Sequence, residues 1–200
     1  MPRHVDPAVR RRQVAEALWR VVVRDGLERA TVRAVAAEAG LSLGAVSHYF
    51  SSQEELRLYA LDLVNERDNA RLAAIPQEGT AREIVERHLW ALLPVDQETR
   101  ESIQVFYAFM VQARTDPTYR EVTAEINQEV VALCRSGIEL LAAHGQVAPG
   151  HDHETLVAEF RALTEGLSFQ AAMWPDTTTP ESIRAVVRRW LDSLATPPVT

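Results

Sequence analysis

Three polar side chains, those of Ser47, His48 and Tyr49, follow one another in the stretch SLGAVSHYF. Hydroxyl and imidazole groups can donate hydrogen bonds to phosphate oxygens and to the edges of bases. Gly44 and Ala45, which precede these residues, are small enough for a helix backbone to approach a large partner closely. Whether this stretch contacts a nucleic acid depends on the elements around it, which would have to hold its polar side outward.

Two helices are expected to come before this stretch. Apolar residues recur at helical spacing over residues 7–24, which predicts a first helix. Thr31 and Ser42 are suitable N-cap residues, so a second helix is expected to end at Gly40 and a third to occupy residues 43–49. Because only GLS separates the second helix from the third, the three have the spacing of a helix-turn-helix unit, whose last helix enters the major groove.

Charge is distributed unevenly along the chain, and all 21 basic residues are arginines. Residues 1–50 hold eight arginines against five acidic residues, a balance of +3. Residues 51–200 hold thirteen against twenty-three, a balance of −10, and the two sum to the −7 of the whole chain. A basic end on an acidic body is typical of a protein that meets a polyanion at one end. A chance fluctuation over fifty residues is the alternative.

The rest of the chain is also predicted to be helical. Ser51 with Glu54, or Ser52 with Glu55, has the spacing of a capping box, so a fourth helix is expected to begin there and to run to Pro76. Five more helices are expected beyond it, and four of their N-caps are predicted to be Thr80, Asp96, Asp116 and Thr179. The predicted fold class is all-α, with about nine helices.

The composition indicates a cytoplasmic protein. The longest apolar runs, such as WALLPV, are far shorter than the ~18 residues of a membrane span. No apolar stretch of signal-peptide type follows the N-terminal arginines. A single cysteine, Cys134, excludes an internal disulfide and fits a reducing compartment. We therefore expect no contact with a membrane.

The N-terminal segment, over about residues 9–60, resembles the DNA-binding domain of the TetR family of bacterial transcriptional regulators. The matching residues are Thr31-Val32, Val35-Ala36, Ala39-Gly40-Leu41-Ser42, Val46, His48-Tyr49-Phe50 and Glu55-Leu56. The resemblance implies a homodimer that binds a pseudo-palindromic double-stranded DNA operator and responds to a small-molecule effector. It implies a helix-turn-helix domain at residues 1–52 and a helical domain for ligand binding and dimerisation at residues 53–200. The protein is expected to be a repressor.

The resemblance also implies roles for single residues. Leu43, Gly44, Ala45 and His48 match positions that face bases. Ser47, Tyr49 and the start of the fourth helix match positions that hold phosphates, and Thr31 and Arg33 match positions that often touch the DNA backbone. The predicted DNA-binding set is Thr31, Arg33, Ser42, Leu43, Gly44, Ala45, Ser47, His48, Tyr49 and Gln53.

Two departures from the family pattern are expected to weaken the binding of DNA phosphates. The family usually has Tyr where this chain has Ser47, and Lys where it has Gln53. Four arginines of the N-terminal arm could compensate, or could simply be solvated: Arg3, Arg10, Arg11 and Arg12. The SHYF version of the motif is similar to a subset that includes repressors of choline and betaine genes, but four residues do not identify an effector.

In TetR proteins the effector binds among the fourth to eighth helices. Large apolar side chains that could line such a pocket here are Trp90, Phe106, Phe109, Met110, Phe169 and Met173. The alternative is that these residues form the core. His88 and Cys134 are expected to be satisfied interior residues. No cofactor or metal is predicted, because the histidine-rich loop HGQVAPGHDHE lacks the spacing of a known zinc site.

Dimerisation is predicted from the last two helices, which are apolar on more than one side. The residues concerned are Leu156, Phe160, Leu163, Leu167, Ala171, Trp174, Ile183, Val186, Val187, Trp190, Leu191 and Leu194. They could pair in a four-helix interface or only cover the monomer core.

Two other classes of function stay open, an enzyme and a protein-interaction module. An enzyme is disfavoured because no phosphate loop and no carboxylate-His helix motif occur. An interaction module that has lost DNA binding is compatible with Ser47 and Gln53.

Overall fold

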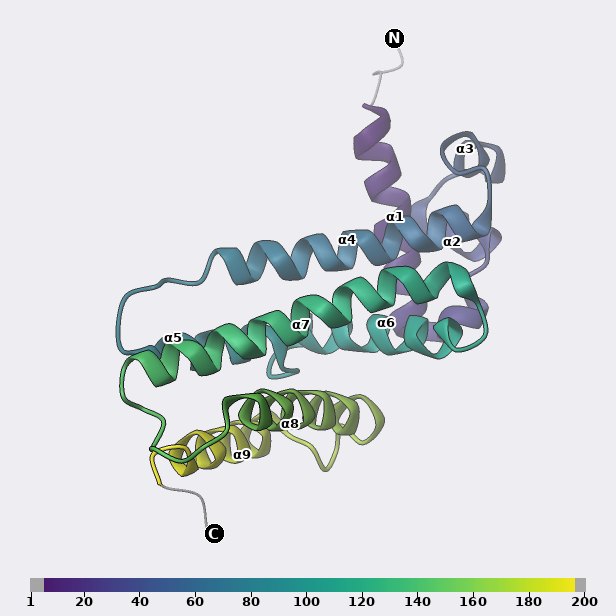
Figure 1. Cartoon of the computed structure of the whole chain (residues 1–200). Helices are drawn as coiled ribbons and strands as arrows, with labels where there is room; N and C mark the ends of the chain where they lie inside the picture. The colour runs from purple at the N-terminus through teal and green to yellow at the C-terminus, as the bar shows by residue number, and fades with distance from the viewer. Residues whose placement is uncertain (1–5, 197–200) are drawn as a thin grey trace. The chain divides into compact units, whose positions relative to one another are not determined.

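The computed structural model describes residues 6–196, and within that range it contains nine α-helices, one 3-10 turn and no strand (Figure 1). The prediction of an all-α fold with an N-terminal helix-turn-helix unit is confirmed. In chain order the elements are α1 (Pro7–Asp25), η1 (Leu27–Arg29), α2 (Val32–Ala39), α3 (Leu43–Tyr49), α4 (Gln53–Ala73), α5 (Ala81–Leu92), α6 (Gln97–Ala113), α7 (Pro117–Ala143), α8 (His153–Met173) and α9 (Pro180–Ser193).

The described chain forms two compact units. The first unit comprises residues up to Arg67 together with residues 104–120, and the second comprises residues 68–103 and those from Glu121 onward. The helix-turn-helix elements belong to the first unit. The second unit contains α5, α8, α9 and most of α7.

The core of the first unit forms where α1 packs against α2 and α3. The four apolar positions that predicted α1 are all buried: Val14, Leu18, Val21 and Val22. Val35 of α2 and Val46 of α3 complete this core, and neither side chain is more than 1% exposed. Burial of these branched side chains holds two short helices that would be marginal by themselves.

Most helices begin at the residues that the sequence predicts. Thr31, Ser42, Thr80 and Thr179 each accept a hydrogen bond from the backbone amide three residues further on. Asp96 and Asp116 stand directly before α6 and α7, and their carboxylates accept hydrogen bonds from backbone amides of the first turns. These bonds satisfy amides that have no partner inside the helix.

The second unit is built around a separate apolar core contributed by α5, α7, α8 and α9. Ile138 of α7 and Ile183 of α9 are fully buried. The rings of Phe160 and Trp190 stack with centroids 4.8 Å apart, in keeping with the side-by-side course of α8 and α9 in Figure 1. No helix within residues 6–196 is long and apolar enough to cross a bilayer.

The histidine-rich loop before α8 serves the helix ends. The carboxylate of Asp152 accepts hydrogen bonds from the amide of Thr155 at 2.9 Å and from its hydroxyl at 2.7 Å. Nε2 of His151 lies 2.8 Å from the carbonyl oxygen of Thr196. Asp152 is therefore the N-cap of α8, and His151 links the loop to Thr196, which follows α9.

Candidate nucleic-acid interface and cavity

Helix α3 has an inner and an outer side. Val46 faces inward and is 1% exposed, and Phe50, just after the helix, is also buried. The outer side carries Leu43, which is 44% exposed, and the exposed Gly44. Four further members of the predicted DNA-binding set lie on α3 or at its start: the exposed Ser42, Ser47 and His48 and the half-buried Ala45. Together these residues form a small, uncharged surface whose backbone is accessible.

The N-terminus of α2 supplies two further predicted residues. Thr31 is exposed, and its hydroxyl caps the helix by accepting a hydrogen bond from the amide of Ala34 at 3.2 Å. Arg33 is exposed and makes no ion pair with any described residue. A free guanidinium beside the positive end of a helix favours an anion, and a DNA phosphate is such an anion.

Arg11 joins α1 to the region where α3 ends and α4 begins. Its Nη1 donates to the carbonyl oxygen of Tyr49 at 2.6 Å, and its Nη2 donates to Oε1 of Glu55 at 3.0 Å. The guanidinium carbon also lies 4.4 Å from the ring centroid of Phe50 and 4.9 Å from that of Tyr59. Because the guanidinium fork is rigid, these contacts fix the C-terminus of α3 relative to α1.

Glu55 is in turn held by the loop that follows α3. Its Oε2 accepts hydrogen bonds from the hydroxyl and the amide of Ser51, both at 2.8 Å. Hydrogen bonds from Ser51 and then from Arg11 lower the pKa of Glu55 below its ordinary value. The amide of Glu55 donates to the Ser52 hydroxyl at 3.0 Å, so Ser52 is the N-cap of α4. In a regular capping box the Glu55 carboxylate would accept a hydrogen bond from the amide of the N-cap residue, Ser52. Here it accepts one from the amide of Ser51 instead.

The other arm arginines have different surroundings. Nη1 of Arg10 donates to the side-chain oxygen of Gln13 at 2.8 Å, and Arg12 forms an exposed ion pair with Glu66 at 3.4 Å. Arg3 lies outside the described residues. The hypothesis that these arginines compensate for missing phosphate contacts stays a prediction, but two donors of Arg11 are already bound to Tyr49 and Glu55.

The last two predicted DNA-binding residues are half-buried. Nε2 of Gln53 donates to the carbonyl oxygen of Ala30 at 3.4 Å, which ties the start of α4 to the segment before α2. The ring of Tyr49 meets His48 edge to face at 5.1 Å. Their predicted contacts with phosphates therefore stay predictions.

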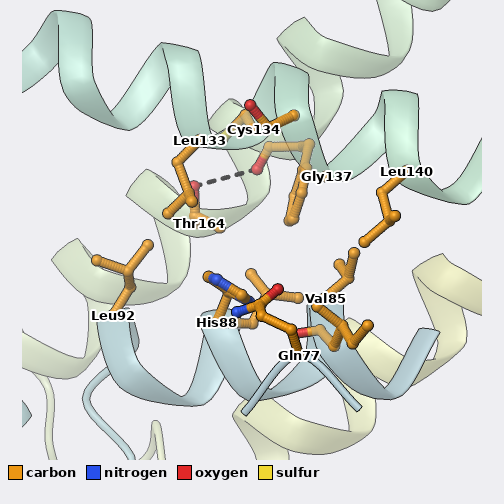
Figure 2. Close-up of a pocket in the computed structure, with 13 residues that line it drawn as sticks. Gln77, Val85, His88, Leu92, Leu133, Cys134, Gly137, Leu140 and Thr164 are labelled. Atoms are coloured by element: carbon orange, nitrogen blue, oxygen red, sulfur yellow. Dashed lines mark hydrogen bonds between the residues drawn. The ribbon is translucent and has the colours of Figure 1, made fainter. Parts of the chain in front are cut away.

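The second unit contains a cavity of about 140 Å³ between α5, α7 and α8. Figure 2 shows His88 and Gln77 on one side of it and Cys134, Gly137 and Thr164 on the other. The described residues that line it are Gln77, Ile84, Val85, His88, Leu89, Leu92, Leu133, Cys134, Ser136, Gly137, Leu140, Phe160 and Thr164. Apolar side chains make up most of this lining, which suits it to an organic molecule.

None of the six predicted ligand-binding residues lines this cavity. Phe109 is fully buried, with its ring 5.6 Å from that of Tyr119, and Trp90 lies under the guanidinium of Arg184 at 5.0 Å. Phe106 and Met110 are half-buried, Phe169 and Met173 are exposed, and their contact with a ligand stays a prediction. His88 and Cys134, expected to be interior residues, both line the cavity. The sequence signal that could have indicated this region was Gly137, because a glycine inside a long helix often marks a place where another segment packs closely.

A short exposed helix, α3, that packs against α1 and α2 is the arrangement of a helix-turn-helix DNA-binding unit. Residues 15–60 match the model described as bacterial regulatory proteins, tetR family. Residues 81–196 match the model described as the C-terminal part of BetI-type transcriptional repressors. The chain belongs to the TetR family of bacterial transcriptional regulators.

Individual relatives agree with this assignment. The chain is 32% identical over 195 residues to the HTH-type transcriptional regulator PksA of Bacillus subtilis, covering 97% of this chain and 94% of that protein. A crystal structure of a transcriptional regulator from Rhodococcus aligns with a TM-score of 0.77 at 29% identity, covering 94% of this chain and 99% of that chain. A regulator from Saccharomonospora viridis, solved in complex with choline, aligns with a TM-score of 0.80 at 21% identity, covering 92% and 96%. At that identity the last likeness concerns the fold alone.

The contacts of Arg11 predict that it positions α3 without touching DNA. We expect Arg11→Met to weaken binding to specific DNA roughly tenfold, the equivalent of about 1.4 kcal/mol, because α3 loses its fixed orientation. Fluorescence anisotropy over a salt series measures both the affinity and its salt dependence. The slope of log affinity against log salt should match that of the wild type. A slope smaller by about 1 would instead mark Arg11 as a phosphate contact.

The open backbone at Gly44 predicts opposite effects on stability and on binding. No other described segment comes within 4 Å of the position that a Cβ would take, so Gly44→Ala fits the free protein. Alanine is the better helix former, and the free energy of unfolding should rise by up to about 1 kcal/mol. The added methyl group should weaken DNA binding about tenfold by holding the backbone away from the groove. Urea unfolding measures the change in stability, and fluorescence anisotropy measures the change in DNA affinity. Unchanged DNA affinity would show that DNA does not approach Gly44.

Proposed function

We propose that the protein is a cytoplasmic, homodimeric repressor that binds a pseudo-palindromic operator through α3 and the start of α2, and is released by a small molecule. The observation that carries the proposal is the outer surface of α3, held in place by Arg11 and open around Gly44. A helix presented in this way fits the major groove, where the exposed Leu43 can contact thymine methyl groups and His48 can bond to base edges.

Electrostatic attraction to DNA is expected to be moderate. Within the helix-turn-helix unit, four arginines are paired with carboxylates: Arg11 with Glu55, Arg12 with Glu66, Arg20 with Glu38, and Arg24 with Asp25 and Glu38. Arg29 and Arg33 are exposed and have no ion pair among the described residues. The charge excess of the N-terminal quarter therefore acts largely within the protein, and few phosphates can be neutralised.

Exposed apolar residues of the second unit support dimerisation. Phe169 and Met173 lie near the end of α8, and Trp174, which directly follows the helix, is 57% exposed. Val186 on α9 is also exposed. Exposed apolar side chains of this size favour burial against another protein surface. A second copy of the chain is the partner proposed here, because each operator half-site requires its own α3.

The cavity supports the proposed response to a small molecule. A compound that binds one conformation better than another shifts the protein toward it, and DNA affinity falls by the ratio of the two ligand affinities. The BetI-type model describes repressors, which favours repression over activation for this chain as well. A regulator is also favoured over an enzyme, because the family to which the chain belongs consists of transcriptional regulators.

The proposal predicts specific binding that depends measurably on Arg33. By fluorescence anisotropy, DNA from upstream of the protein's own gene should bind at least tenfold tighter than scrambled DNA of equal length. Arg33→Gln should weaken binding to both and reduce the salt slope by about 1, because one phosphate contact is lost. Arg114→Gln, which removes the same charge from an exposed residue directly after α6, is the matched control and should change neither quantity. Equal binding of the two DNAs would count against an operator in that region.

The exposed end of α8 predicts the site of dimerisation. Trp174→Glu should raise the dimer dissociation constant by about tenfold or more, because a charge would be buried where an aromatic anchor packs. Sedimentation velocity at several protein concentrations measures this change. Val111→Glu, on an exposed valine of α6 in the first unit, should leave the dimer intact. A dimer that tolerates Trp174→Glu but not Val111→Glu would place the interface elsewhere.

A further inference from the structure

We propose that the cavity of the second unit takes a small, uncharged and mainly apolar molecule that donates one hydrogen bond to Nε2 of His88, and that it rejects quaternary ammonium cations. This inference rests on the proposed ligand response, because it names the class of molecule that would act there. It departs from the choline bound to the regulator of similar fold from Saccharomonospora viridis.

The lining of the cavity holds no formal charge. None of the described residues around it is Asp, Glu or Arg. A cation that enters an apolar space loses its hydration and requires a carboxylate or several aromatic faces in return. Since neither a carboxylate nor a permanent cation faces the space, the lining favours neutral molecules over ions of either sign.

Aromatic side chains do not replace the missing carboxylate. Apart from the imidazole of His88, Phe160 provides the lining's one aromatic ring among the described residues. One face of that ring is already covered by Trp190, at a centroid distance of 4.8 Å and an interplanar angle of 26°. Trp90 is engaged by the guanidinium of Arg184. A cage of aromatic faces around a trimethylammonium group is therefore absent from the described lining.

His88 offers a directed polar contact in this apolar space. Its Nδ1 lies 2.8 Å from the carbonyl oxygen of Ile84, one turn earlier in α5. A carbonyl oxygen only accepts hydrogen bonds, so in the neutral ring the proton is assigned to Nδ1, and Nε2 carries a lone pair. Nε2 lies on the far side of the ring from this bond and has no hydrogen-bond partner among the described residues. It is thus an acceptor for a hydroxyl or N–H group of the ligand.

The buried polar groups opposite His88 are already occupied or neutral. The Thr164 hydroxyl lies 3.1 Å from the carbonyl oxygen of Phe160 and 2.9 Å from that of Arg161, and it also forms a hydrogen bond with the thiol of Cys134. Figure 2 marks the first of these bonds. Burial raises the pKa of Cys134 to about 11, so its thiol is uncharged at neutral pH. The α7 and α8 side of the cavity therefore presents a neutral surface to the ligand.

The size of the cavity limits the ligand. A volume of about 140 Å³ is close to that of cavities that hold benzene. Gly137 lets Phe160 pack closely against α7 at the edge of this space, because a Cβ at that position would lie 3.1 Å from Cε1 of Phe160 and would displace the ring. A monocyclic compound with one hydroxyl group, such as phenol, has the size and the donor that the lining requires.

The test uses three probes on the full-length protein: phenol, toluene and choline. Isothermal titration calorimetry should show binding of phenol and toluene and none of choline. In His88→Leu the ratio of phenol affinity to toluene affinity should fall by about fivefold, the effect of one lost hydrogen bond. Gly137→Ala should weaken the binding of both phenol and toluene. Leu133→Phe, which fills the cavity from another residue of α7, should have the same effect and replaces Gly137→Ala if that variant disturbs the helix.

Two results would overturn the inference. The first is choline binding tighter than phenol, and the second is an unchanged phenol-to-toluene ratio in folded His88→Leu. The proposed function is tested separately, by whether phenol at saturating concentration releases the protein from DNA in an anisotropy assay. Probes that bind as described without releasing DNA would support the ligand class while contradicting a ligand-released repressor.

Discussion

The recognition surface depends on the anchoring of α3, which has only seven residues and cannot be stable as an isolated helix. Three kinds of contact hold it. Burial of Val46 and Phe50 fixes its inner side, the Ser42 hydroxyl caps its start, and Arg11 binds the carbonyl oxygen of Tyr49 at its end. With both ends and one side committed to the fold, only the outer side remains for DNA. Rigid placement of a short helix also means that a shift of α1 or α4 would move the outer surface as a whole.

The same constraint explains how charge is used in the two units. Most arginines of the helix-turn-helix unit are paired with Glu38, Glu55 or other carboxylates, so they stabilise the arrangement of helices and contribute little to long-range attraction. Binding to DNA then depends on the fit of a small uncharged surface and on Arg33. In the second unit, the carboxylates Glu86 and Asp192 pair with Arg82, and the cavity is lined by neutral groups. Charges hold helices together in both units, whereas the surfaces proposed for recognition are largely neutral.

Local signals predicted the fold well. Caps such as Thr31 and Thr80, and the apolar spacing of α1, depend on residues within a few positions of one another, and such patterns can be recognised in one sequence. The role of Arg11 could not be predicted in this way, because its partners Tyr49 and Glu55 lie 38 and 44 residues further along the chain. A pocket among the fourth to eighth helices was expected, but the residues that line the cavity were missed for the same reason. The cavity is formed by three helices, and the aromatic residues that suggested a pocket pack into cores or lie at the surface, whereas Gly137 and His88 line it.

The most direct test of the central claim is hydrogen–deuterium exchange of the protein with and without DNA from upstream of its own gene. The proposed interface predicts that specific DNA protects backbone amides in the peptides covering residues 31–34 and 42–53, while scrambled DNA of equal length protects them much less. Peptides from α5, which carries His88, should show no direct protection. Protection confined to other parts of the chain, with residues 42–53 exchanging as in the free protein, would contradict the assignment of α3 as the recognition helix.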